Sequence, residues 1–302
     1  MTLHLEDAEV RRLLRLEPLI AGVREALIDL SAGRVVQPLR TVMEIASEQG
    51  LLFVKPVLSR GILAAKLITQ FPRNAERSLP TMLATIVLMD PGTGRTLAVM
   101  DGAWITALRT AAVSAAAADC LATKDAKVVA LLGSGTLART HALALRSVRP
   151  ISEVRIWSRN PEHVARCAVD VEGIPTRTAE EAVRGADIVC TVTTAREPVL
   201  KGAWLKRGAF VAALGAPRPA WRELDDDAMR NVLVVDSYEA ARQESGDVIL
   251  SGAMVSAEIG EILAGTRPRP SAGSTIVFKA LGQAVTDALA ARLVYEARKL
   301  QS

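Results

Sequence analysis

The spacing of hydrophobic and polar positions divides the chain into two parts. Over residues 6–30 the apolar positions recur with helical spacing, Pro18 opens a second helix, and Gly33 ends it. Strands are predicted after this, with a turn joining the last two as a hairpin, at residues 40–46, 51–57, 64–71, 83–89 and 96–101. The first part is therefore predicted to be an α+β unit with antiparallel strands.

The second part alternates strands with helices. After an Ala-rich helix over residues 105–121, strands are predicted at residues 128–132, 154–157, 188–193, 210–214 and 232–236. Such alternation is typical of a doubly wound parallel sheet of the Rossmann type. Residues 278–300 are predicted to form one long amphipathic helix that returns to the first part. The expected fold is thus α/β, with a discontinuous α+β domain at residues 1–122 and 277–302 and a Rossmann domain at residues 123–276.

A glycine turn follows the first strand of the Rossmann domain. It has the form Gly133-x-Gly135-x-x-Ala138, between an apolar strand and the start of a helix. In a dinucleotide site the first glycine allows the tight turn and the second lets the backbone approach the phosphates. The small third residue lets helix and strand pack closely, and free N–H groups at the helix start face the anion. A turn that merely packs tightly is the alternative.

The end of the next strand indicates which nucleotide is bound. NAD enzymes usually carry an acid there for the ribose 2′-hydroxyl, whereas this chain has Ser158, Arg159 and Asn160. A guanidinium with two small polar neighbours suits a 2′-phosphate. NADPH is therefore the expected cofactor, although Arg159 as a solvated surface charge remains open.

Composition excludes several classes of function. Lys and Arg number 37 and Asp and Glu 33, a net charge of +4 that is scattered along the chain, so nucleic acid is not an expected partner. Three cysteines without a CxxC pair, no signal-peptide pattern and no membrane-length apolar run favour a cytoplasmic protein without membrane contact. No histidine has metal-ligand spacing or a carboxylate orienter. We place His4 in a mobile end, and expect His141 to cap or pack in the helix after the glycine turn.

Three basic residues of the first domain lie in or beside apolar elements: Arg40, Lys66 and Arg109. A buried cation is costly unless it is paired or binds an anion. Either they form a pocket for a substrate carboxylate, or they pair internally with Glu44, Asp90 or Asp101. If the Rossmann domain supplies a hydride donor, the other domain should hold the substrate.

Several long blocks, kept in order over nearly the whole chain, resemble the ornithine cyclodeaminase/mu-crystallin family. The clearest are Val36-Gln-Pro-Leu-Arg-Thr-Val42, Ala98-Val-Met-Asp-Gly102, Arg109-Thr-Ala-Ala-Val-Ser-Ala115, Trp221-Arg-Glu-Leu-Asp-Asp226 and Glu244-Ser-Gly-Asp-Val248. The likeness is greater to the ketimine-reductase branch than to the cyclodeaminases. It implies a homodimer in which the discontinuous domain binds substrate and mediates dimerisation.

The resemblance also implies roles for individual residues. Arg40, Lys66 and Arg109 match the residues that bind the substrate carboxylate, with Lys66 and Arg109 expected to take part in catalysis. Ser158, Arg159 and Asn160 match the segment that binds the 2′-phosphate. The remaining cofactor contacts are expected from Thr110, Gly133, Ser134, Gly135, Thr136, Leu137, Ala138, Thr191, Val192, Thr193 and Val277.

Two positions depart from the family pattern. Where cyclodeaminases carry an Asp after the fourth strand, this chain has Pro217, which has neither an acid nor an N–H, followed by Arg218. Lys55 stands where relatives commonly have Met. Both segments are expected to line the substrate site. Lys55 either adds a positive group, reaches a distal carboxylate or extends to solvent.

The function expected from these observations is NADPH-dependent reduction of a cyclic ketimine carboxylate, such as Δ1-piperideine-2-carboxylate or Δ1-pyrroline-2-carboxylate, to pipecolate or proline. Pro217 and Arg159 disfavour the first alternative, an ornithine or lysine cyclodeaminase that uses NAD. The second alternative is a non-catalytic protein that binds iodothyronines.

Overall fold

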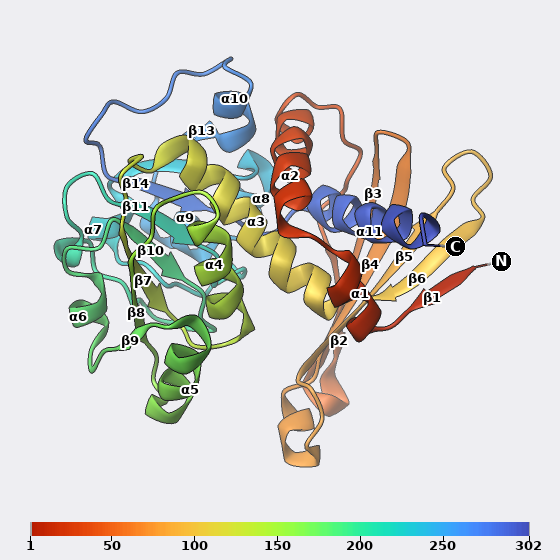
Figure 1. The fold of residues 1–302 in the computed structure, drawn as a ribbon, viewed down its shortest axis with the longest axis horizontal. Coiled ribbons are helices and arrows are strands. Elements are labelled where there is room, and N and C mark those ends of the chain that lie inside the picture. Colours follow the sequence, from red (N-terminus) through yellow and green to blue (C-terminus); the bar gives the residue numbers. More distant parts are fainter. Residues whose placement is uncertain (1, 302) are drawn as a thin grey trace. The chain divides into compact units, whose positions relative to one another are not determined.

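The computed structural model describes residues 2–301. The chain forms two compact units, drawn in Figure 1. Unit 1 consists of Met1–Arg109 with Gln283–Ser302, and unit 2 of Thr110–Gly282. The divisions therefore lie at 109/110 and 282/283, whereas the sequence predicted them at 122/123 and 276/277.

Unit 1 is built on a six-stranded sheet in the order β1-β6-β5-β4-β3-β2. β1 pairs with β6 in parallel, and all other neighbours are antiparallel. The strands are β1 (Leu3–Leu5), β2 (Thr41–Ile45), β3 (Gly50–Ser59), β4 (Ile62–Gln70), β5 (Met82–Met89) and β6 (Thr96–Asp101). His4 lies in β1 opposite Val99, so its predicted place in a mobile end is wrong.

One face of this sheet carries helices. The helices of unit 1 are α1 (Asp7–Leu13), α2 (Leu16–Ser31), the C-terminal α11 (Ala284–Lys299) and the start of α3 (Ala103–Leu121), with the short η1 (Ala46–Glu48) and η2 (Pro72–Arg77) in loops. α11 packs on β3, β4 and β5 and beside α2 (Figure 1). Ile62, Ala64 and Lys66 of β4 alternate onto the buried face, because successive strand residues point to opposite sides.

Unit 2 contains an eight-stranded, wholly parallel sheet in the order β13-β12-β14-β11-β10-β7-β8-β9. The strands are β7 (Val128–Leu132), β8 (Glu153–Trp157), β9 (Ile174–Pro175), β10 (Ile188–Thr191), β11 (Phe210–Ala213), β12 (Val232–Val235), β13 (Val255–Glu258) and β14 (Ile276–Lys279). The helices are α4 (Thr136–Arg146), α5 (Pro161–Val171), α6 (Ala179–Val183), η3 (Gly202–Trp204), α7 (Asp226–Met229), α8 (Tyr238–Glu244), α9 (Gly246–Ser251) and α10 (Ile259–Leu263). The predicted doubly wound parallel sheet is confirmed.

β14 is the main error of the sequence prediction. Ile276–Lys279 was expected to begin the domain return and the long C-terminal helix, but it forms a strand between β11 and β12, and all four residues are buried. A strand buried on both faces shows no alternation, so periodicity cannot separate it from a buried helical turn. The final helix therefore begins at Ala284.

Candidate active site

A buried cluster of charged side chains lies in unit 1 around Asp287 of α11. Its Oδ1 lies 2.6 Å from Nζ of Lys66 and 2.8 Å from Nε of Arg109, and its Oδ2 lies 3.2 Å from Nζ of Lys55. All four residues are buried, with Lys66 only 1% exposed. Burying a charge is costly unless it is paired. Three cations around one carboxylate make an electropositive site suited to a further anion.

Sheet register and one helix start bring these residues together. Lys55 of β3 and Lys66 of β4 are directly opposed in the antiparallel pair, so both ammonium groups lie on the face covered by α11. The side chain of Gln37 holds the start of α11: it accepts from the N–H of Val285 and donates to Oε1 of Gln283. Asp287 thus lies in the first helical turn, where the helix dipole also favours a carboxylate.

The charges in the cluster shift one another's proton affinity. Burial opposes ionisation of Asp287, but Arg109 and the two lysines outweigh it and hold the pKa of Asp287 well below its usual range. Burial lowers the pKa of Lys66 well below its ordinary value, and lowers the pKa of Lys55 to about 8. Asp287 counteracts this in both lysines, whereas Arg109 adds to it.

Arg109 retains an unsatisfied donor. Its Nε is buried and near Asp287, yet this N–H has no aligned hydrogen-bond acceptor among residues 2–301. A buried donor without an acceptor costs about 1–3 kcal/mol, so a ligand that accepts a hydrogen bond from it would recover that energy. This fits the predicted role of Arg109 in binding a carboxylate.

The structure pairs Lys66 and Arg109 with an acid that the sequence analysis did not consider, Asp287, and the predicted carboxylate pocket stays a prediction. The three carboxylates considered as partners are used elsewhere or exposed: Asp90 accepts from Gly92 and Thr93, Asp101 accepts from the N–H of Ala103, and Glu44 is exposed. Lys55 is 6% exposed and bound to Asp287, so extension to solvent is excluded. Arg40 is half-buried just before β2, and its charge acts on Lys55.

Asp287 was missed by sequence reasoning. The available signal was a single acid inside the apolar stretch Ala284-Val-Thr-Asp-Ala-Leu-Ala, which is as unusual as the lysines in their strands. Asp287 lies 221 positions from Lys66, so no local pattern links the two residues.

The glycine turn of unit 2 has the geometry of a phosphate-binding loop. Gly133 has φ +129°, and a Cβ there would lie 2.8 Å from the carbonyl oxygen of Val192, so the position requires glycine. Gly135 precedes α4 with no side-chain cap and with open space around its Cα. The exposed Thr136 and half-buried Leu137 begin the helix, and the buried Ala138 packs it on the sheet. The turn therefore fits a pyrophosphate.

The predicted 2′-phosphate segment lies beside this turn. The Ser134 and Ser158 hydroxyls are 2.8 Å apart, which joins the turn to the end of β8. Arg159 is exposed at the end of β8. Asn160 has an additional function as the N-cap of α5, because its Oδ1 accepts from the backbone N–H groups of Glu162 and His163. The loop thus presents one guanidinium and two hydroxyls suited to a phosphate.

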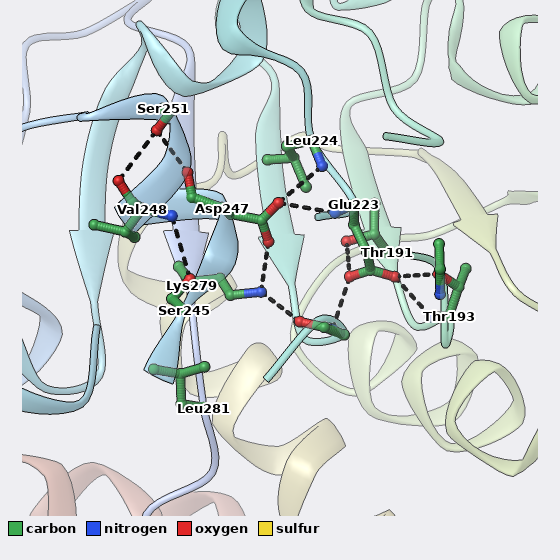
Figure 2. Close-up of polar contacts among 12 residues, drawn as sticks. Thr191, Thr193, Glu223, Leu224, Ser245, Asp247, Val248, Ser251, Lys279 and Leu281 are labelled. Atoms are coloured by element: carbon green, nitrogen blue, oxygen red, sulfur yellow. Dashed lines mark hydrogen bonds and ion pairs between the residues drawn. The ribbon is translucent and has the colours of Figure 1, made fainter. Parts of the chain in front are cut away.

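Figure 2 shows a buried polar network at the carboxyl ends of β10, β11 and β14. Glu223 accepts from the Thr191 hydroxyl, from the N–H and hydroxyl of Thr193, and from the N–H of Gly215, each at 2.7 Å. Lys279 donates to the carbonyl of Gly215 and lies 2.8 Å from Asp247, which also accepts from the N–H of Glu223.

This network engages the side chains of residues that were predicted to contact the cofactor. The Thr191 and Thr193 hydroxyls donate to Glu223, so both side chains help to hold the chain at the end of β10. Thr191 is fully buried. Val277 is 0% exposed within β14, so its side chain packs in the core, and its predicted cofactor contact stays a prediction. Thr110, which was also predicted to contact the cofactor, is only 8% exposed, and that contact stays a prediction.

Pro217 and Arg218 follow the same network. Gly215 of the network begins a turn in which Ala216 has φ +52° and the half-buried Pro217 follows. The guanidinium of Arg218 lies over the ring of Trp221, 5.2 Å from its centroid. The position after β11 therefore carries no acidic group, as the sequence indicated.

His141 is placed to pack within unit 2, as the sequence analysis expected. His141 is fully buried, its Nδ1 lies 2.7 Å from the carbonyl of Leu137, and its Nε2 lies 2.9 Å from the hydroxyl of Ser114. Burial lowers its pKa to about 4, so it packs as a neutral ring. Within residues 2–301 no cluster of metal ligands occurs, and no helix is long and apolar enough to cross a membrane.

Comparison with known proteins places these features in context. A profile of the ornithine cyclodeaminase/mu-crystallin family matches residues 2–301. The chain is 45% identical over 286 residues to the ketimine reductase mu-crystallin of Mus musculus, covering 92% of this chain and 91% of the mouse protein. It is similar to the Thermococcus litoralis Δ1-pyrroline-2-carboxylate reductase, solved with NADH and L-proline, at TM-score 0.94 and 34% identity over 99% and 98% of the two chains. An archaeal alanine dehydrogenase dimer with bound NAD matches at TM-score 0.93 and 32% identity, over 99% and 97%.

Proposed function

Because the chain belongs to the ornithine cyclodeaminase/mu-crystallin family and is an oxidoreductase acting on C=N bonds, we propose that it reduces a cyclic ketimine carboxylate with NADPH. The substrates are Δ1-piperideine-2-carboxylate and Δ1-pyrroline-2-carboxylate, and the products L-pipecolate and L-proline. The observation that carries the proposal is the buried group of Lys55, Lys66 and Arg109 around the single acid Asp287.

The substrate carboxylate is bound by the cations of unit 1. Arg109 supplies the N–H that lacks an aligned acceptor within the described chain, and Lys66 and Arg40 add positive charge. A charge-assisted hydrogen bond to a carboxylate is about twice as strong as a neutral one, and the guanidinium also fixes orientation. Holding the carboxylate fixes the position of the adjacent C=N carbon relative to the hydride donor. This orientation lowers the barrier to hydride transfer.

Lys66 is the proposed proton donor. Its Nζ lies within the cluster, 3.3 Å from the hydroxyl of Thr106 and 2.6 Å from Asp287. As the C=N π bond breaks, the imine nitrogen takes a proton from the Lys66 ammonium, which is left as a neutral amine and regains a proton from water. A bound dihydronicotinamide supplies the hydride that forms the new C–H bond.

A nicotinamide dinucleotide is the cofactor, and NADPH is its proposed form. The glycine turn of unit 2 supports pyrophosphate binding through Gly133, Gly135 and the start of α4. Arg159 with the linked Ser134 and Ser158 supports recognition of the 2′-phosphate. The two solved relatives carry NADH and NAD, so the support for NADPH comes from these residues and not from those structures.

Pro217 favours imine reduction over the cyclodeaminase alternative. Deamination of a free amino acid needs a group that handles the amine and water protons, and the turn after β11 offers no acid for this. The nearby acids Glu223 and Asp247 are fully buried and hydrogen-bonded to backbone and threonines. Reduction of an existing C=N bond needs only one proton.

The test is the loss of NADPH absorbance with each cyclic imine at mildly acidic and neutral pH. NADH and L-ornithine serve as parallel controls. Rapid NADPH-preferring turnover is expected, and it should rise towards acidic pH because Lys66 then holds the proton that turns the imine into the iminium, the better hydride acceptor. Ammonia release from ornithine without net cofactor change would instead establish the cyclodeaminase. Tight iodothyronine binding with no turnover of either substrate would establish the carrier.

We also propose a cytoplasmic homodimer formed through the sheet face of unit 1 that α11 does not cover. That face is apolar and partly exposed, with Met43 at 58%, Leu67 at 37% and Leu83 at 50% exposure. Exposed apolar patches commonly mark association sites. Light scattering should give a dimer that Leu67→Lys weakens, whereas Met254→Lys, at an 88% exposed position in unit 2, should leave it intact.

The proposed cytoplasmic location is supported by the three cysteines, which are free and buried and fit a reducing compartment.

A further inference from the structure

Two lysines of unit 1 lie opposite each other and share one carboxylate. Lys55 and Lys66 are register partners on β3 and β4, and their ammonium groups contact the two different oxygens of Asp287. From this arrangement we propose that Lys55 is a positioning residue that makes the Lys66 ammonium release its proton more readily to the imine nitrogen. The inference rests on the proposed function and concerns how its proton is delivered.

The groups that face Lys66 come from every element packed around it. β3 contributes Lys55, α3 contributes Arg109 and the Thr106 hydroxyl, and α11 contributes Asp287. β5 places the uncharged Ile86 opposite Lys66. Asp287 therefore contacts three cations at once.

This distribution of charge acts on Lys66 in a definite direction. The ammonium of Lys66 is repelled by Lys55 and Arg109 and attracted by Asp287, and burial adds to the repulsion. Repulsion between like charges is strong where water is excluded. The positive charge of Lys55 thus lowers the pKa of Lys66. Arg109 cannot be the adjustable member, since its guanidinium keeps its proton and is needed for the substrate carboxylate.

A lowered pKa suits the chemistry proposed for Lys66. A general acid works best when its pKa lies near the working pH, and an ordinary lysine holds its proton too tightly. A methionine at position 55 would fill similar volume without the charge. By lowering the pKa of Lys66, Lys55 thus makes proton transfer to the imine nitrogen faster near neutral pH than it would be with Arg109 and Asp287 alone.

The first experiment compares pH profiles of kcat and kcat/KM with NADPH and Δ1-piperideine-2-carboxylate. In Lys55→Met the fall of activity on the alkaline side should occur about one pH unit higher, because Lys66 then stays protonated to a higher pH. It should also lower kcat on the acidic plateau several-fold, as expected for a weaker acid. Lys55→Arg preserves the charge and should keep the limb close to that of the unaltered chain. The substrate's own titration is the same in all three proteins.

A raised KM with an unmoved limb in Lys55→Met would overturn the inference, because Lys55 would then only help to bind the carboxylate. A second measurement is independent of turnover: the ε-carbon NMR signal of Lys66 in lysine-labelled protein, assigned with Lys66→Met, is titrated with pH. Its midpoint should rise in Lys55→Met, and an unchanged midpoint would overturn the inference. If the unaltered chain reduces no cyclic imine, the proposed function fails, whatever the titration of Lys66 shows.

Discussion

The carboxylate of Asp287 lies 2.6 Å from the ammonium of Lys66, although 221 positions separate the two residues. The ion pair joins the last helix of the chain to a central strand of the same sheet. It is nearly excluded from water, with side-chain exposures of 1% for Lys66 and 2% for Asp287. The C-terminal segment therefore completes the charged site as well as the core of unit 1.

Asp287→Asn should destabilise the protein strongly. The change leaves Lys55, Lys66 and Arg109 buried without their counter-ion, and breaking a buried ion pair in this way costs about 3–5 kcal/mol. Urea unfolding at neutral pH measures the loss. Glu296→Gln is the matched control on the same helix, since its ion pair with Arg292 is about half exposed, and it should change stability by less than about 0.5 kcal/mol. A loss for Asp287→Asn no larger than the control's would contradict the role given to Asp287.

The stability of the protein should depend on alkaline pH through Lys55. Burial lowers its pKa from 10.5 to about 8, so between these values the unfolded chain binds more protons than the folded one. Stability therefore rises with pH across that window, by up to about 3 kcal/mol from this residue. The difference in unfolding free energy between the unaltered chain and Lys55→Met should shrink correspondingly from pH 8 to 10.5. A constant difference would show that Lys55 is charged equally in both states.

Sequence reasoning identified the cations of this site but not what holds them. Lys66 and Arg109 could be identified because each is a charged residue among apolar neighbours in the local sequence. Their partner Asp287 lies on another segment, and long-range pairing leaves no trace in local periodicity. The same limit applies to Glu223 and Lys279, whose hydrogen bonds depend on strands β10, β11 and β14 meeting at one edge. The glycine turn was predictable because its conformational demand is local.

Arg109→Ala should remove substrate binding while sparing the cofactor. The guanidinium is 6% exposed and provides a donor without an aligned acceptor in the described structure. Loss of such a charged contact costs about 2–5 kcal/mol, so kcat/KM for the cyclic imine should fall about 30- to 5,000-fold. NADPH affinity, measured by fluorescence titration, should change less than about threefold. An equal fall in NADPH affinity would assign Arg109 to the cofactor.

Arg159→Ala should reverse the preference between nucleotides. Loss of a charged hydrogen bond to the 2′-phosphate costs about 1.5–3 kcal/mol, so NADPH should bind about 10- to 160-fold more weakly, with NADH nearly unaffected. Arg166→Ala, at an exposed position on the following helix, is the matched control and should alter neither affinity. Parallel losses of NADPH and NADH in Arg159→Ala would mean that the residue supports the fold of the loop.

The two glycines of the turn should respond differently to the same added methyl group. At Gly133 the φ of +129° and the 2.8 Å approach to the carbonyl of Val192 oppose any side chain, so Gly133→Ala should lower both the melting temperature and NADPH affinity. At Gly135 the φ of −84° suits alanine, and nothing lies within 4 Å of the new carbon. Gly135→Ala should therefore fold normally and lose affinity only because the methyl group occupies the space that the pyrophosphate needs. Thermal unfolding and NADPH titration of both variants measure this. Unchanged NADPH binding in Gly135→Ala would place the phosphates elsewhere, because the open space at Gly135 is what the turn offers them.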